Sequence, residues 1–245
     1  MSDDSSIEDL KTQDYSARTR EQKRYQGQIS AVRYLDPHDY VDATKLKATI
    51  NSPAVQTWMA DLNLTDEDYI AWMQEQGEAK NRRHHLFAVS ASQRANTENV
   101  GEVQGFVYFY SGPEEKQQAQ RLVEEGLLTS TDLDQNRLLE ISFAKSPDTP
   151  PGRMVGGIMQ ACLEISNRMQ RVGDSDPNNI VVLAYIDPEN SNSIKAAEAA
   201  GFIGIGTVSG YGEDTEPNKV YKLSWSLLNQ KMQSDALKYF NIQPA

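Results

Sequence analysis

The stretch LLEISFAKSPDTPPGRMVGGIMQACLEI, from Leu138 to Ile165, begins as a buried strand, breaks at a loop rich in proline and glycine, and resumes as an apolar helix. Glycine permits backbone angles that other residues avoid, and the N-terminus of a helix presents backbone N–H groups to an anion. The stretch therefore predicts a diphosphate cradle, with Gly152 at the bend. Arg153 would add positive charge in the same direction as the helix dipole.

A second interpretation of this loop stays open. Gly156 and Gly157 would let a bound group approach the first helical turn, but they would equally let the helix pack closely on its neighbours. In that case the loop only connects a strand to a helix. A loop of this kind is a weak motif when it is taken alone.

The bulk properties of the 245-residue chain exclude several classes of protein. No apolar run approaches the roughly 18 to 20 residues that a membrane-spanning helix requires. The N-terminal segment lacks an apolar core and mixes both signs of charge, so it is neither a secretory signal nor a transit peptide, and a cytoplasmic location is expected. The formal charge of −11 argues against general nucleic-acid binding and leaves open the attraction of a cationic partner.

Metal and disulfide chemistry are not expected. Cys162 is the single cysteine, which excludes an internal disulfide and any cysteine-rich metal site. Its apolar neighbours favour a small buried hydrophobic residue over an acyl-carrying nucleophile. His84 and His85 are adjacent in a predicted strand, so their side chains would point to opposite faces and would not bind one ion together.

The order of the expected elements favours one large domain of the α+β class, in the α/β-type arrangement of a mixed sheet with helices on both faces. Residues 1–27 are polar and predict a flexible arm, 28–226 the domain with a helical insertion at 113–134, and 227–245 a helical tail.

Alternating and apolar runs predict strands, and amphipathic runs predict helices. Strands are expected at 28–35, 85–91, 100–112, 137–144, 180–186, 202–210 and 219–228, the second and third as an antiparallel hairpin. Helices are expected from Asp36 and Pro37 onward and at 54–64, 65–76, 113–128, 153–171, 191–200 and 229–240.

A second motif, IDPENSNSIKAAEAAGFIGIG at 186–206, is more restrictive than the first. A strand ends in Asp-Pro, Asn190 follows, and an alanine-rich helix leads through Gly201-Phe202 into the next strand. Together with Arg153-x-x-Gly156, this arrangement resembles the GCN5-related N-acetyltransferase (GNAT) superfamily of acyl-coenzyme A dependent acyltransferases. The family pattern is Arg/Gln-x-x-Gly-x-Gly/Ala. This sequence matches its first two fixed positions and departs from the third, where Ile158 replaces the glycine or alanine.

The resemblance implies a sheet of about seven strands in which strands four and five splay apart. The pantetheine arm of acetyl-coenzyme A would lie between them against the backbone of strand four, and the diphosphate would meet the amides of the loop. Asn190 would bond the pantetheine or the chain around it. The cofactor-binding residues expected on this basis are Phe143, Ala144, Lys145, Gly152, Arg153, Met154, Val155, Gly156, Gly157 and Asn190.

Acyl transfer to an amine requires a base that removes a proton from that amine. Glu140 lies within the apolar run LLEISFA, where desolvation would raise the pKa of a carboxyl group and suit it to this role. A glutamate at the corresponding place is the base in the histone-acetylating branch of the family, whose pattern is similar to Glu140-Ile141-Ser142-Phe143. The alternatives are an outward-facing, solvated side chain and one paired with an arginine.

The group that protonates the leaving thiolate is harder to identify. The family often places a tyrosine seven residues after the asparagine of the second motif, and here that position is Ala197. Tyr185 and Tyr211 are candidates to replace it, although a tyrosine at either place is more often a packing residue. Ser193 is expected to cap the helix that follows Asn190.

The resemblance assigns acceptor specificity to the first two helices and to the loop SGYGEDTEPN at 209–218, where Tyr211 and Glu213 favour a polar, cationic amine. The function expected is an N-acetyltransferase that acts on a small-molecule or peptide amine, as a monomer or homodimer. Two alternatives stay open. One is an acyl-coenzyme A binding module with weak or no catalysis, and the other is an unrelated α/β fold with an accidental loop.

Overall fold

The structure, a computed structural model, describes residues 30–34, 40–58, 83–91, 103–134, 138–147, 149, 152–171, 179–209 and 217–240. The predicted N-terminal arm at 1–27, the helix start at Asp36 and Pro37, and the predicted helix at 65–76 lie outside these residues.

Seven strands of the described chain form one sheet in the order β1-β2-β3-β4-β5-β7-β6. Their bounds are β1 Ser30–Tyr34, β2 Arg83–Ala91, β3 Val103–Ser111, β4 Leu138–Lys145, β5 Val181–Ile186, β6 Phe202–Val208 and β7 Asn218–Leu223. Only β4 and β5 run parallel, while every other neighbouring pair is antiparallel, including the predicted hairpin of β2 and β3. The predicted mixed sheet is confirmed.

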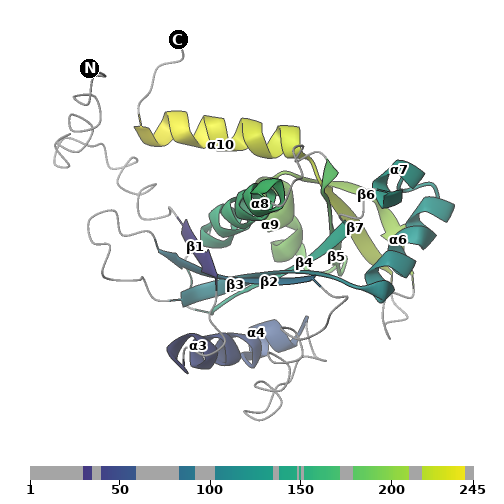
Figure 1. Ribbon diagram of the computed structural model, residues 1–245. Helices are drawn as coiled ribbons and strands as arrows, with labels where there is room; N and C mark the ends of the chain where they lie inside the picture. The colour runs from purple at the N-terminus through teal and green to yellow at the C-terminus, as the bar shows by residue number, and fades with distance from the viewer. Residues whose placement is uncertain are drawn as a thin grey trace, which may run out of the picture.

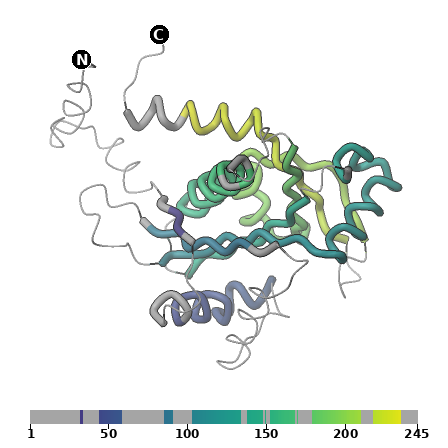
Figure 2. The backbone as a smooth tube through the Cα atoms, viewed as in Figure 1, coloured from purple at the N-terminus to yellow at the C-terminus, as the bar shows by residue number. Residues whose placement is uncertain are grey.

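Helices cover both faces of this sheet, as the sequence predicts (Figure 1). Their bounds are α3 Tyr40–Ile50, α4 Pro53–Gln56, α6 Pro113–Glu124, α7 Ser130–Asp134, α8 Arg153–Arg171, α9 Ser191–Ala200 and α10 Trp225–Phe240. Figure 1 shows α8, α9 and α10 on one face, α3 and α4 on the other, and α6 with α7 beside β6 and β7. The tube in Figure 2 follows the same path, with α8 and α9 side by side.

The largest part of the core lies between the sheet and α8. Ile158, Cys162 and Ile165 recur at the spacing of one helix face and are fully buried against β2, β3 and β4. Burial raises the pKa of the Cys162 thiol, which therefore stays protonated as a small core side chain. No helix in the described ranges combines the length and the apolar composition needed to cross a membrane.

The last strand is shorter than the sequence predicts. Residues 219–228 were expected to continue as strand, but β7 ends at Leu223 and α10 begins at Trp225. Trp225 and Leu228 enter the core at helical spacing, and the indole of Trp225 donates a hydrogen bond of 2.9 Å to the carbonyl of Ile180. Tertiary packing decides the state of an apolar run whose period fits either element.

Candidate functional site

β4 and β5 are paired over only part of their length. Leu138 lies opposite Val181, Leu139 opposite Val182, and Glu140 opposite Leu183. Beyond that point β4 continues to Lys145 and β5 to Ile186 without pairing to each other. An unpaired strand edge presents N–H and C=O groups to a partner chain or ligand. The predicted splay between strands four and five is therefore confirmed.

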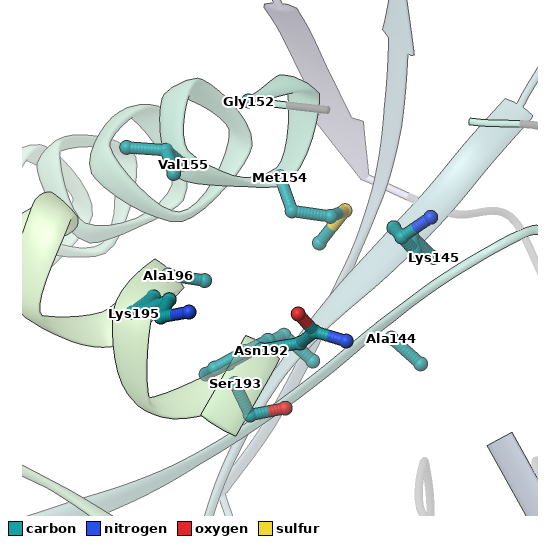
Figure 3. A pocket seen from close by; sticks show the side chains of 10 residues that line it. Ala144, Lys145, Gly152, Met154, Val155, Asn192, Ser193, Lys195 and Ala196 are labelled. Atoms are coloured by element: carbon teal, nitrogen blue, oxygen red, sulfur yellow. The ribbon is translucent and has the colours of Figure 1, made fainter. Parts of the chain in front are cut away.

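A pocket of about 460 Å³ lies where the two strands separate. Its walls come from the end of β4, the start of α8 and the start of α9, and Figure 3 shows Lys145, Met154 and Asn192 around the same space. Phe143 packs against the core under α8, and Ala144 packs against the core under α3. The lining residues are Phe143, Ala144, Lys145, Gly152, Met154, Val155, Asn192, Ser193, Lys195 and Ala196.

Gly152 turns the chain into α8 at this pocket. Its φ of +83° lies in the left-handed region that favours glycine, as predicted for the bend. Because α8 begins at Arg153, the four amides from Gly152 to Val155 lie ahead of the first intrahelical hydrogen bond. Those of Met154 and Val155 donate to no group outside their own helix within the described ranges. Together with the helix dipole they form the kind of site that holds an anion.

Gly156 and Gly157 lie beyond these four amides, and neither lines the pocket. A Cβ atom on Gly157 would come within 2.7 Å of Val89 Cγ1, so this glycine lets α8 approach β2. The close-packing interpretation therefore accounts for Gly157.

The positive charge at the pocket comes from lysines. Arg153 is only 3% exposed and does not line the pocket, whereas Lys145 and Lys195 do, from β4 and α9. Lys145 also donates a hydrogen bond of 3.3 Å from Nζ to the carbonyl of Thr149. The Thr149 hydroxyl in turn donates to the carbonyl of Gln104, which ties the loop before α8 to β3.

Asn190 organises the start of α9. Its Oδ1 accepts a hydrogen bond of 3.1 Å from the amide of Ser193, so Asn190 is the capping residue. The expectation that Ser193 caps this helix is wrong, because Ser193 supplies the amide and its own side chain lines the pocket. Asn192, Lys195 and Ala196 join it there and were not singled out from the sequence. The available signal was topological, because helices that follow two neighbouring parallel strands begin at the same edge of the sheet.

Glu140 lies at the last position where β4 pairs with β5 and is only 4% exposed. It faces Tyr110 on β3, whose hydroxyl donates a hydrogen bond to Glu140 Oε1. The solvated alternative for Glu140 is therefore wrong, and one partner of its side chain is a tyrosine on β3.

Tyr185 follows Leu183 by two positions on β5, so its side chain lies on the same face of the sheet as Glu140. Burial raises the pKa of Tyr185 far above its ordinary value, and the negative charges of Glu140 and Glu115 act in the same direction. The hydroxyl therefore keeps its proton at neutral pH, beside the point where the strands separate.

Three positions considered in the sequence do not line the pocket as described. Ala197, where the family often has a tyrosine, lies on the core-facing side of α9 and is 0% exposed. Tyr211 and Glu213 lie outside the described residues. Among the residues that the structure describes, no group of three or more histidine, cysteine, aspartate or glutamate side chains is placed to hold a metal ion.

Comparison with known proteins identifies the architecture. No protein-family model matches the sequence, and no curated protein is significantly similar to it. Solved structures do match. The aminoglycoside acetyltransferase AAC(6')-Ib, in a complex with acetyl-coenzyme A, superposes with a TM-score of 0.54 at 15% identity, over 82% of this chain and 96% of that one. The same enzyme has also been crystallised with coenzyme A and kanamycin.

Two further structures agree with this match. A GNAT-family acetyltransferase from Bacillus anthracis gives a TM-score of 0.51 at 14% identity, over 80% of this chain and 95% of that one. A chimera of the spermidine N-acetyltransferase SpeG from Vibrio cholerae gives a TM-score of 0.51 at 12% identity. The match covers 83% of this chain and 98% of that one. At such identities the likeness establishes the fold.

Proposed function

We propose that this protein, whose fold is that of the GNAT acetyltransferases, is an acyl-coenzyme A dependent N-acyltransferase. It would transfer acetyl from acetyl-coenzyme A to a primary amine by direct attack in a ternary complex. The observation that carries the proposal is the separation of β4 from β5 after Glu140, with a pocket at the opening.

The residues around this pocket fit the parts of acetyl-coenzyme A. The unpaired edge of β4 from Phe143 to Lys145 offers backbone groups to the amides of a pantetheine arm. The amides that begin α8, from Gly152 to Val155, suit the diphosphate, and the side chains of Lys145 and Lys195 add positive charge. Asn190 supports this arrangement by fixing the start of α9, which forms the opposite wall.

The proposed reaction needs a base for the amine. Acetyl-coenzyme A supplies the activated acyl group, and in the net reaction a C–N bond forms, a C–S bond breaks and the amine loses a proton. Glu140 is the proposed acceptor of that proton, because its carboxylate lies where the two strands separate. This assignment would account for a carboxylate at a nearly buried position.

Tyr185 is the proposed partner of the leaving sulfur. Its raised pKa lies above the ordinary value of a thiol, about 8.5, so complete proton transfer to a thiolate would be uphill. A hydrogen bond from the neutral hydroxyl would still stabilise the negative charge that develops on sulfur. In this proposal Tyr185 is therefore a hydrogen-bond donor, and the thiolate takes its proton from solvent.

The acceptor is proposed to be a cationic amine, on a small molecule or a peptide. The matched AAC(6')-Ib binds kanamycin, and SpeG is a spermidine N-acetyltransferase, which supports an amine acceptor for this fold. The contribution of Tyr211 and Glu213 to the acceptor site stays a prediction. The monomeric or homodimeric state and the cytoplasmic location also stay predictions.

A second function is favoured by one observation. At Ala197, where the family often carries a tyrosine, the side chain is buried in the core and has no hydroxyl. A protein that keeps the coenzyme site but lacks an efficient proton donor would bind acyl-coenzyme A as a sensor or regulatory module.

Two measurements separate these functions. Isothermal titration with acetyl-coenzyme A should show binding under both, whereas release of free thiol over a panel of primary amines is expected only from the transferase. Binding without thiol release would support the binding module. Absence of binding would refute both.

A further inference from the structure

We propose that Tyr110 is a positioning residue, which holds the Glu140 carboxylate in the orientation from which it accepts a proton from the acceptor amine. The inference rests on the proposed function and deepens it, since it assigns a role to a residue on β3, a strand that does not line the pocket.

The first support is the geometry of the pair. Tyr110 and Glu140 are directly opposite each other on the antiparallel strands β3 and β4, and the tyrosine hydroxyl donates to Glu140 Oε1. A carboxylate that is nearly removed from water needs hydrogen bonds to remain charged. Tyr110 supplies one from a neighbouring strand, where the backbone ladder fixes the distance between the two residues.

The second support is that the tyrosine itself is held in place. Its ring stacks on that of Tyr108, with centroids 5.0 Å apart and an interplanar angle of 22°. Tyr108 in turn packs against the cluster of buried side chains between α3 and the sheet. The Tyr110 hydroxyl is therefore anchored through two rings to the face of the sheet that α3 covers.

This anchoring has a consequence for the carboxylate. Because Oε1 accepts the hydrogen bond from the Tyr110 hydroxyl, the proton of the amine would be accepted at Oε2, in an orientation that the Tyr110 hydrogen bond selects. A hydrogen bond to the charged form also favours that form, so Tyr110 would keep Glu140 active as a base at lower pH. Other titratable residues that the structure places in this region are Tyr185 on β5 and Glu115 on α6, and His84 on β2 lies opposite Tyr110 in the strand register.

The test is the Tyr110→Phe substitution, which keeps the stacking ring and removes the hydroxyl. We expect kcat for thiol release to fall roughly tenfold with an unchanged KM for acetyl-coenzyme A, because a hydrogen bond to a charged group is lost. The rise of activity with pH should move upward by roughly one unit for the same reason. An unchanged kcat and pH profile would overturn the proposal.

The matched control is Tyr221→Phe. Tyr221 donates a hydrogen bond of 3.5 Å to Glu198 on α9, so this substitution removes a second tyrosine–glutamate pair. Tyr221 lies opposite Ala184, the neighbour of Leu183, so this pair is on the other face of the sheet from Glu140. It should leave the pH profile in place. A shift equal to that of Tyr110→Phe would show a general effect of lost tyrosine hydroxyls and would overturn the proposal.

A second readout is independent of activity. Carbon-13 NMR of the glutamate carboxyl groups, with the Glu140 signal assigned from Glu140→Gln, should show the titration of Glu140 moving to higher pH in Tyr110→Phe. An unmoved titration would refute the positioning role whatever the activity. Failure of the proposed function is recognised separately, as a wild-type protein that binds acetyl-coenzyme A and releases no thiol with any amine.

Discussion

Glu140 lies opposite Leu183 in the last pair that joins β4 to β5. The proposed base therefore stands where the sheet opens, on the same strand that supplies the pocket from Phe143 onward. Glu140 and Phe143 are three residue steps apart along the strand, a distance of about 10 Å at about 3.3 Å per step. One strand thus carries both the proposed base and the edge proposed to bind the acyl carrier, which keeps the two in fixed relation.

Replacing Glu140 with glutamine should remove the base and leave the pocket intact. Thiol release at saturating acetyl-coenzyme A is expected to fall by roughly 100-fold, in the usual range for loss of general-base catalysis. The rise of rate with pH should flatten, while the dissociation constant for acetyl-coenzyme A, measured by titration calorimetry, stays the same. Wild-type kinetics in this variant would remove Glu140 from the mechanism.

The bend at Gly152 can be tested with a matched pair of substitutions. Gly152 and Gly126 have φ of +83° and +76°, and neither has an atom near the position of a new Cβ. Alanine should cost about 1 kcal/mol of folding free energy at either site, because it disfavours the left-handed region. Only Gly152→Ala should also weaken acetyl-coenzyme A binding, by roughly tenfold, since it disturbs amides that face the pocket.

Calorimetric titration of both variants, with thermal unfolding as the check on stability, decides the matter. Equal loss of binding in Gly126→Ala would attribute the effect to stability. Unchanged binding in Gly152→Ala would show that the bend is not part of the coenzyme site.

Much of this fold follows from local sequence signals. The hairpin of β2 and β3, the helix from Arg153 to Arg171, and the strand that begins at Val181 all have strong periodicity or a run of β-branched residues, which local reasoning detects. Residues 225–228 were misassigned because their apolar spacing fits either a strand or a helix. Only the burial of Trp225 against β5 decides between the two.

The parts of the candidate site that the backbone forms were predictable from the sequence. The charged side chains that line it were less predictable. The residues from Phe143 to Lys145, together with Gly152, Met154 and Val155, were selected from the sequence and line the pocket, because strand end and loop bend are local features. Their binding of the coenzyme stays a prediction. The side chain of Arg153 is buried instead, and Lys195 takes its place at the pocket from a helix far along the chain. Which charged side chain lines the pocket depends on how the ends of two helices meet in space, and no local sequence pattern encodes that.

The ion pair between Asp132 and Lys222 should stabilise the attachment of α7 to β7 in a pH-dependent way. The two charged groups are 2.5 Å apart. Burial alone would raise the pKa of Asp132, but hydrogen bonds from Lys222 and Thr129 outweigh that effect and hold the pKa below its ordinary value. A lowered pKa in the folded state means that the pair stabilises the protein above the ordinary aspartate pKa and loses this contribution as pH falls.

Asp132→Asn is therefore expected to lower the free energy of unfolding by about 0.5 to 1 kcal/mol at pH 7. The difference from wild type should shrink as the pH falls below about 4. Urea unfolding at a series of pH values measures it, and a difference that persists undiminished in acid would show that the charge is not responsible.

The contact of Gly157 with Val89 predicts a destabilising substitution at a residue that does not line the pocket. A Cβ on Gly157 would meet Val89 Cγ1 at 2.7 Å and Cγ2 at 2.8 Å, so Gly157→Ala forces α8 away from β2. We expect a loss of about 1 to 3 kcal/mol from overpacking, which the higher helix propensity of alanine offsets only in part. Adding Val89→Ala should recover part of the loss, and thermal unfolding followed by circular dichroism would show it. Failure of that rescue would place the strain elsewhere.

Tyr185→Phe distinguishes a hydrogen-bond donor from an obligatory acid. If the neutral hydroxyl only stabilises charge on the leaving sulfur, its removal should lower kcat by roughly 10-fold, a typical effect for one charge-assisted hydrogen bond. The decline of activity at high pH should then be the same in variant and wild type, because the raised pKa of Tyr185 keeps it neutral throughout the working range. A loss of a decline that the wild type shows at high pH would instead identify Tyr185 as a titrating acid. Rates unchanged across the whole range would assign it to packing between β5 and α6, where its ring contacts the buried cluster that includes Ala119 and Leu122.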